Sequence, residues 1–114
     1  MPLLRITANY FADSLDKNAV VKQFSSGVAD ILGKPESYVM VVLDENQTMS
    51  FAGSQDPMAY IELKSLGLPD DRTTEFSQKL CALSETLLNI SPSRIYIEFS
   101  SPQRHHWGWD NRTF

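Results

Sequence analysis

The pattern of apolar and polar positions divides the chain into two halves that share one order of elements. Residues 3–8 (Leu-Leu-Arg-Ile-Thr-Ala) have the composition of a strand. A segment suited to helix capping follows at residues 13–16, and apolar residues then recur at helical spacing between positions 20 and 32. Gly33 is expected to end this helix. Residues 38–43 (Tyr-Val-Met-Val-Val-Leu) then form a β-branched strand.

The second half of the chain repeats this order. Residues 58–63 have strand composition, a helix begins at Asp70–Thr73, and residues 94–99 (Arg-Ile-Tyr-Ile-Glu-Phe) form the last main strand. The side chains expected on the inner face of this second helix are Phe76, Leu80, Leu83 and Leu87.

These patterns predict a single domain over residues 1–114, built from two βαβ units at about residues 2–44 and 57–100. The segment Met49–Pro57 joins the two units. Right-handed crossovers place both helices on one face of a four-stranded mixed sheet. The fold class is therefore α/β (α+β by some schemes).

The face of the sheet opposite the helices is expected to be bare. The strand patterns place apolar residues on both faces, and an exposed apolar face of that size is unusual for a monomer. A second copy of the chain is the expected cover, so the sequence predicts a homo-oligomer. The residues on which this prediction rests are Leu3, Leu4, Val41, Val42, Ile61, Leu63, Ile95, Tyr96, Ile97 and Phe99.

Composition narrows the range of partners. The net charge of −4, without a basic stripe, argues against nucleic acid as a partner. No segment has the length of a membrane span, and no signal-peptide pattern is found. The single cysteine, Cys81, excludes an intrachain disulfide and is read as a small core residue. The expected compartment is the cytoplasm, and unconventional export is the alternative.

The two N-terminal residues, Met1 and Pro2, carry the main candidate for chemistry. Inside a chain a proline nitrogen is an amide, which is not basic. Removal of Met1 turns this nitrogen into a secondary amine with a pKa near ~8, which burial or a nearby cation lowers further. Such an amine can act as a general base at neutral pH. The alternative is that Pro2 only gives the first strand a rigid start.

The order and spacing of several segments resemble the macrophage migration inhibitory factor branch of the tautomerase superfamily, nearly from end to end. The segments that carry the resemblance are Met1-Pro2, Gly33-Lys34-Pro35, Gln47–Pro57, Ser65-Leu66-Gly67, Ile90–Ile97 and Gly108–Phe114. The resemblance implies a homotrimer whose sheets line a central channel, with the helices outside. It also implies a cofactor-free phenylpyruvate tautomerase that acts on phenylpyruvate and hydroxyphenylpyruvate, and on dopachrome-type compounds. A cytokine-like protein that binds receptors and has a vestigial pocket is the alternative.

The resemblance implies roles for individual residues of this sequence. Pro2 matches the catalytic base, and Lys34 matches the lysine that binds the substrate carboxylate. Leu66 matches a position, usually isoleucine, that lines the pocket. Tyr96 matches a tyrosine that reaches the pocket from the neighbouring subunit. Two further matches, Trp109 and Phe114, are aromatic walls against the substrate ring, or else interface residues.

Three positions depart from the family pattern. Glu98 stands where the vertebrate cytokine has asparagine, and an ionised carboxylate can only accept hydrogen bonds. Glu98 is therefore expected to weaken phenylpyruvate turnover, to pair with Lys34 or Arg104, or to shift the preferred substrate towards another enolisable acid. Met58–Ile61 replaces the Cys-x-x-Cys of the cytokine, so no thiol oxidoreductase activity is expected. The loop Arg104–Trp107 forms a bulkier, cationic rim, and its adjacent histidines lack a third ligand, so no metal site is predicted.

Overall fold

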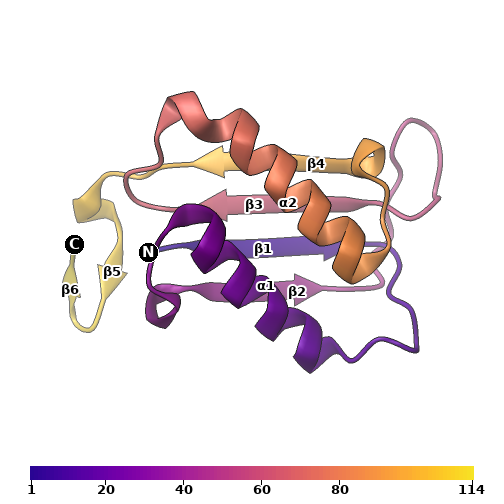
Figure 1. The fold of residues 1–114 in the computed structure, drawn as a ribbon, viewed down its shortest axis with the longest axis horizontal. Helices are drawn as coiled ribbons and strands as arrows, with labels where there is room; N and C mark the ends of the chain where they lie inside the picture. Colours follow the sequence, from indigo (N-terminus) through magenta and orange to yellow (C-terminus); the bar gives the residue numbers. More distant parts are fainter.

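The computed structural model describes residues 1–114 and contains the two predicted βαβ units in one sheet. The first unit comprises β1 (Leu3–Ala8), α1 (Lys17–Leu32) and β2 (Met40–Asp44), and the second comprises β3 (Ala59–Lys64), α2 (Thr73–Leu88) and β4 (Ile95–Ser100). The strand order is β2-β1-β3-β4, and only the central pair, β1 and β3, is antiparallel. Both helices lie on the same face of this mixed sheet (Figure 1), which confirms the predicted fold class.

Local hydrogen bonds explain where the helices begin and end. The carboxylate of Asp16 accepts a hydrogen bond from the backbone N–H of Asn18 at 2.9 Å, which caps the start of α1. Gly33 ends α1 in the left-handed conformation at φ 64°, as the sequence predicts. Asn89 ends α2 in the same way at φ 57°. No helix in the structure has the length and apolar character needed to cross a membrane.

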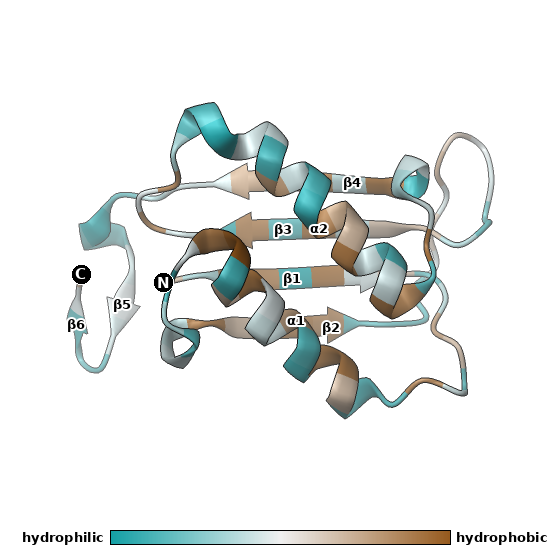
Figure 2. Ribbon diagram, viewed as in Figure 1, coloured by the Kyte–Doolittle hydropathy of each residue, from teal (hydrophilic) through white to brown (hydrophobic).

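The core lies between the sheet and the two helices. On β1 and β3 every second side chain faces the helices and is buried, and hydrophobic colour dominates these two strands in Figure 2. Phe24 of α1 and Leu80 of α2 are fully buried against them. Leu83 and Leu87 are half-buried, and Ser84 and Leu88 complete the buried face of α2. The buried face of α2 is therefore rotated slightly around the helix axis relative to the prediction, so that Ser84 and Leu88 are buried in place of Leu83 and Leu87.

Short 3₁₀ turns delay the start of three elements relative to the prediction. Residues Glu36–Tyr38 form such a turn, so β2 begins at Met40 and not at Tyr38. The turns Asp70–Arg72 and Pro92–Arg94 likewise precede α2 and β4. In each case a proline stands at or just before the turn, and its fixed φ keeps the chain from entering the next element at once.

The open face of the sheet is mixed and not uniformly apolar, so the prediction for this face is wrong for β3 and β4. Their apolar side chains Ile61, Leu63, Ile95, Ile97 and Phe99 all belong to the helix side. The open face instead carries two rows of mainly charged and aromatic side chains that run across the four strands. The first row is Val42, Arg5, Glu62 and Glu98, and the second is Asp44, Thr7, Tyr60 and Tyr96.

Apolar groups on the open face are concentrated at a few positions. Met40 and Tyr96 are 63% and 66% exposed, and Val42 is 37% exposed. Arg5 pairs with Asp44 at 2.8 Å. The Tyr60 hydroxyl donates to Glu98 at 3.0 Å, and this bond raises the pKa of Tyr60. The open face therefore combines a few exposed apolar side chains with paired polar ones.

A C-terminal hairpin that the sequence did not reveal lies beside the N-terminus. It consists of β5 (Gly108–Trp109) and β6 (Arg112–Thr113). Asp110 and Asn111 link them with φ angles of 50° and 64°, which are the signs required by a type I′ turn. Figure 1 shows the hairpin at the end of the sheet where β1 begins and β4 ends.

The loop Met49–Pro57 lies at the other end of the sheet and is held by Arg94. The Arg94 guanidinium donates to the carbonyls of Phe51 at 2.8 Å, Ser54 at 3.1 Å and Asp56 at 3.0 Å. It also lies over the Phe51 ring, with its central carbon 5.1 Å from the ring centroid. This distance is within the ~6 Å limit of a cation–π contact. One side chain at the entrance of β4 thus organises the connection between the two βαβ units.

Replacing Arg94 with lysine should loosen this loop. Lysine keeps the charge but lacks the planar fork that reaches several carbonyls at once. Hydrogen exchange at Phe51 and Ser54, whose N–H groups bond each other's carbonyls at 2.9 and 3.0 Å, should accelerate. The expected factor is roughly 10–100, since a hydrogen bond from a charged group contributes ~1.5–3 kcal/mol. Arg72→Lys on the exposed start of α2 is the control. Unchanged exchange in the Arg94 variant would show that the loop is held by its own turn.

Candidate functional site

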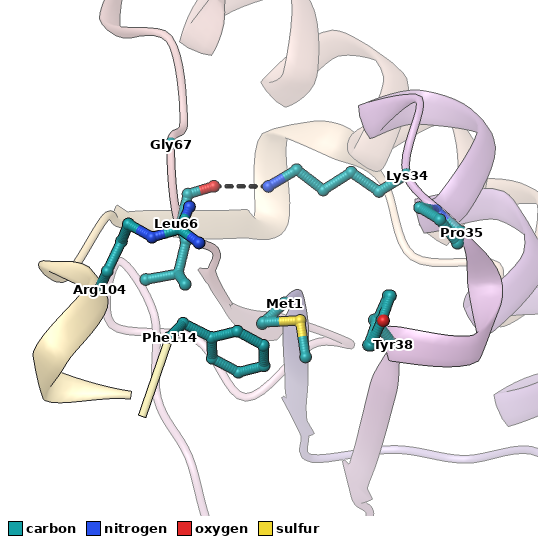
Figure 3. Close-up of a pocket in the computed structure, with 8 residues that line it drawn as sticks. All are labelled: Met1, Lys34, Pro35, Tyr38, Leu66, Gly67, Arg104 and Phe114. Carbon is teal, nitrogen blue, oxygen red and sulfur yellow. Dashed lines mark hydrogen bonds between the residues drawn. The ribbon is translucent and has the colours of Figure 1, made fainter. Parts of the chain in front are cut away.

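A cavity of about 400 Å³ opens at the end of the sheet where the chain begins. It is lined by the residues drawn in Figure 3, namely Met1, Lys34, Pro35, Tyr38, Leu66, Gly67, Arg104 and Phe114. They come from the N-terminus, the end of α1, the turn before β2, the segment after β3 and the C-terminal region. This volume lies in the usual range for small-molecule sites.

Lys34 is fixed in this cavity by neutral oxygen atoms. Its ammonium group donates to the Ser65 hydroxyl at 2.7 Å and to the Leu66 backbone carbonyl, the contact drawn as a dashed line in Figure 3. Ser65 is fully buried, so the position of its hydroxyl is well defined. No aspartate or glutamate side chain lines the cavity. The positive charge of Lys34 therefore remains available to a ligand.

The electrostatics at the N-terminus favour an unprotonated amine. Partial burial, and secondarily the positive charge of Lys34, lower the pKa of the Met1 amino group. Burial also lowers the pKa of the Lys34 ammonium. An amine at this end of β1 thus lies in surroundings that suit a base.

A second cavity of about 460 Å³ adjoins the first and contains Pro2. Met1 and Tyr38 line both cavities, and Trp107 and Trp109 line the second. Met1 therefore lies between Pro2 and the cavity that holds Lys34. With Met1 attached, the Pro2 nitrogen is an amide and carries no basic lone pair.

The C-terminal aromatic residues form one stacked group along these cavities. Trp109 and Phe114 stack with ring centroids 5.7 Å apart and an interplanar angle of 12°. Tyr38 packs edge-on against Trp109 at 5.8 Å, and Arg112 covers the Trp109 ring at 5.0 Å. Such a group provides flat apolar walls, which are suited to a planar or aromatic ligand.

The structure brings together five of the seven predicted site residues. Pro2, Lys34, Leu66, Trp109 and Phe114 line the two adjoining cavities. Tyr96 and Glu98 lie elsewhere, on the open face of the sheet.

Tyr96 lines a separate apolar cavity of about 410 Å³ at the end of the sheet near the Met49–Pro57 loop, where it packs on Phe51 at 4.6 Å. Glu98 bonds the Tyr60 hydroxyl and has neither Lys34 nor Arg104 as a partner within the chain. The expected pairing of Glu98 with one of these two cations is therefore not found in the chain.

Two residues of the site were not recognised in the sequence. Ser65 continues the buried alternation of β3 beyond Leu63, and a polar residue at such a position is a signal that could have been used. Tyr38 was assigned to a strand, whereas the 3₁₀ turn Glu36–Tyr38 aims it at the cavities. Arg104 was placed on the rim, and it lines the first cavity itself.

The structure holds no group of three or more histidine, cysteine or acidic side chains arranged for a metal ion. His105 and His106 lie in the exposed 3₁₀ turn Arg104–His106, with ring centroids 4.1 Å apart.

Comparison with known proteins gives a consistent result over the whole chain. Residues 1–114 match the family model described as macrophage migration inhibitory factor (MIF). A macrophage migration inhibitory factor homolog from Brugia malayi is 36% identical over 115 aligned positions, covering 100% of this chain and 99% of the relative. The macrophage migration inhibitory factor of Meriones unguiculatus is 32% identical, with the same coverage.

Solved structures agree with these relatives. The crystal structure of a macrophage migration inhibitory factor homologue from Prochlorococcus marinus superposes with a TM-score of 0.90 at 41% identity, covering 98% of both chains. The corresponding protein from Trichinella spiralis gives a TM-score of 0.91 at 33% identity, covering 98% of this chain and 99% of that one.

Proposed function

Because this chain belongs to the macrophage migration inhibitory factor family, whose fold is that of the tautomerases, we propose that it is a cofactor-free keto–enol tautomerase. The proposed substrates are aromatic 2-oxo acids such as phenylpyruvate and hydroxyphenylpyruvate. The observation that carries the proposal is the placement of Pro2, Lys34 and the aromatic group in two adjoining cavities.

The proposed reaction needs one group that accepts a proton and returns it. Once Met1 is removed, the Pro2 nitrogen takes the proton of the enol hydroxyl, and the oxygen electrons form the ketone C=O. As this C=O forms, the electron pair of the carbon–carbon double bond takes a proton from the Pro2 ammonium onto the substrate's β-carbon, and the double bond becomes a single bond. Atoms and charge balance without a cofactor, and the amine is regenerated.

The remaining residues orient the substrate. Lys34 binds the carboxylate by a charge-assisted hydrogen bond, and Ser65 holds the Lys34 ammonium in place. The stack of Trp109 and Phe114 provides a wall for the substrate ring. An apolar wall also limits water around the Pro2 amine, and desolvation disfavours the charged form of an amine.

We further propose that the chain works as a homotrimer with shared sites. Tyr96 lies at the opposite end of the sheet from Pro2, so one chain cannot supply both to one site. A neighbouring copy packed on the open face can supply Tyr96 and Glu98. The exposure of Tyr96 and Met40 on that face is consistent with such packing.

The test of the proposed function is the ketonisation of phenylpyruvate followed by ultraviolet absorbance. The sample is protein whose intact mass shows that Met1 is absent, and the control is protein that retains Met1. Turnover well above the buffer rate in the first sample alone is the expected result. The absence of turnover from processed, correctly assembled protein would exclude this activity and favour a binding role for the cavity.

Replacing Lys34 with glutamine should raise KM for phenylpyruvate much more than it lowers kcat. The carboxylate is bound equally in the ground state and the transition state, so its loss affects mainly binding. The expected rise in KM is about 10–100-fold, the range for a hydrogen bond that involves a charged group. Lys22→Gln, an exposed change on α1, is the matched control. A large fall in kcat at unchanged KM would instead place Lys34 in the proton transfer.

Ser65→Ala should change KM in the same direction by a smaller factor. The variant removes one of the two acceptors that hold the Lys34 ammonium. A KM equal to that of the unmodified protein would show that the Leu66 carbonyl is sufficient to position Lys34.

A further inference from the structure

We propose that this cavity selects 2-oxo acids that carry a second anionic group, and that Arg104 binds that group. The inference rests on the proposed tautomerase function for the identity of the first group, and it adds a substrate class and a specificity-determining residue.

Two positive side chains line the first cavity, and no negative side chain lines it. Lys34 enters from the end of α1, and Arg104 enters from the 3₁₀ turn that follows β4. Figure 3 shows the Lys34 amine and the Arg104 guanidinium approaching Leu66 from opposite sides. The cavity is therefore a positively charged space with room for a ligand of the size of an aromatic acid.

Arg104 differs from every other arginine in the chain because its side chain has no partner. Arg5 and Arg72 form ion pairs with Asp44 and Glu75. Arg94 donates to backbone carbonyls, and Arg112 covers the Trp109 ring. The Arg104 guanidinium takes part in no hydrogen bond, ion pair or ring contact, although its backbone carbonyl accepts from Trp107 at 3.2 Å.

The two cations of the cavity are suited to two separate anionic groups. The Lys34 ammonium already donates to the Ser65 hydroxyl and the Leu66 carbonyl, so its one remaining N–H can donate to one carboxylate. The planar guanidinium of an arginine binds a carboxylate through two parallel hydrogen bonds. Because the two side chains enter one cavity from different elements, a ligand with two carboxylates is the class that can pair with both.

The other walls favour an aromatic spacer between the two anions. Tyr38 and Phe114 line the same cavity as the two cations, and Leu66 is a buried aliphatic residue. A dicarboxylate with a flat apolar middle therefore contacts every part of the wall. A 2-oxo acid with an uncharged ring leaves Arg104 without a partner.

The experiment compares a dianion with the matching monoanion in binding and in turnover. Calorimetry measures Kd for 4-carboxyphenylacetate and for phenylacetate, which do not react. Kinetics compare kcat/KM for 4-carboxyphenylpyruvate and phenylpyruvate. The protein, freed of Met1, is compared with Arg104→Gln and with Arg72→Gln, which removes the same charge from the start of α2, outside both cavities.

We expect the unmodified protein to prefer the dianion in both measurements. Arg104→Gln should reduce this preference by about tenfold, the lower end for a charged hydrogen bond because Arg104 is exposed, whereas Arg72→Gln should leave it within about twofold. An equal affinity for the two acids, or a preference that Arg104→Gln does not change, would overturn the inference.

The outcomes separate this inference from the proposed function. Pro2-dependent turnover of phenylpyruvate without a dianion preference rejects the role of Arg104 and leaves the tautomerase intact. Binding of the dianion that depends on Arg104, without any turnover, supports the anion site and rejects the tautomerase.

Discussion

Replacement of Pro2 by glycine, in protein from which Met1 has been removed, should lower kcat/KM for phenylpyruvate by ~10²–10⁴-fold, the usual contribution of a general base. Glycine supplies a primary amine with more freedom at the start of β1, so both the basicity and the position of the nitrogen change. The surroundings of that amine, with Lys34 nearby and partial burial, stay the same.

The pH profile provides a second measurement of the same base. In the proposed mechanism the active form of Pro2 is unprotonated, so kcat/KM should rise with pH through the pKa of the amine and then level off. Burial and Lys34 lower the pKa of the terminal amine at Met1, and we expect the Pro2 amine to titrate below its ordinary value for the same reasons. Lys34→Gln removes the neighbouring charge and should therefore move the rise to higher pH.

The Pro2→Gly result is informative only if the variant folds and assembles as the parent does. The control is its far-ultraviolet circular dichroism and its mass in solution, both compared with the processed parent. Turnover that is unaffected in a folded variant would mean that another group, or solvent, moves the proton.

Phe24→Ala should cost about 3–5 kcal/mol of unfolding free energy, the range for loss of a buried phenylalanine. Phe24 is fully buried on α1 and belongs to the cluster that joins this helix to β1 and β3. The helix and sheet cannot close the gap without shifting both layers, so a cavity remains. Chemical denaturation at one fixed protomer concentration measures the change, because assembly also contributes to stability.

The neighbouring exposed change Gln23→Ala is the matched control and should alter stability by less than ~0.5 kcal/mol. A loss in Phe24→Ala as small as that of the control would indicate that the core repacks, and that α1 is held mainly by contacts elsewhere.

Most of the fold could be predicted from the sequence because its elements follow simple periodicities. The alternation at Leu4, Ile6 and Ala8, and the helical stripe ended by Gly33, correspond directly to β1 and α1. The nature of the open face could not be predicted as well. The even spacing of Ile61 and Leu63 places both side chains on one face of β3. When Tyr60 is counted as hydrophobic, however, the strand looks apolar on both faces, and this composition led to the wrong expectation for the open face.

The hairpin at residues 108–113 was missed for a related physical reason. Its turn uses Asp110 and Asn111, which tolerate positive φ less readily than the glycine that marks most such turns. The site was partly predictable because Pro2, Lys34, Leu66 and Phe114 lie in motifs. Ser65, Tyr38 and the inward aim of Arg104 depend on the way distant segments meet, which no local pattern records.

The burial of Pro2 at the start of a central strand has a consequence for protein synthesis. Pro2 is almost fully buried and its carbonyl accepts from Met40 at 3.0 Å, so the folded chain shields the bond that an aminopeptidase must cut. The earliest partner of β1 is β2, which is complete at residue 44. At translation rates of ~5–20 residues/s, about 2–10 s pass before β2 has been synthesised. From then on, removal of Met1 must compete with the pairing of β1 and β2. If translation and folding are faster than the aminopeptidase, the folded protein keeps Met1, and the Pro2 nitrogen remains an amide.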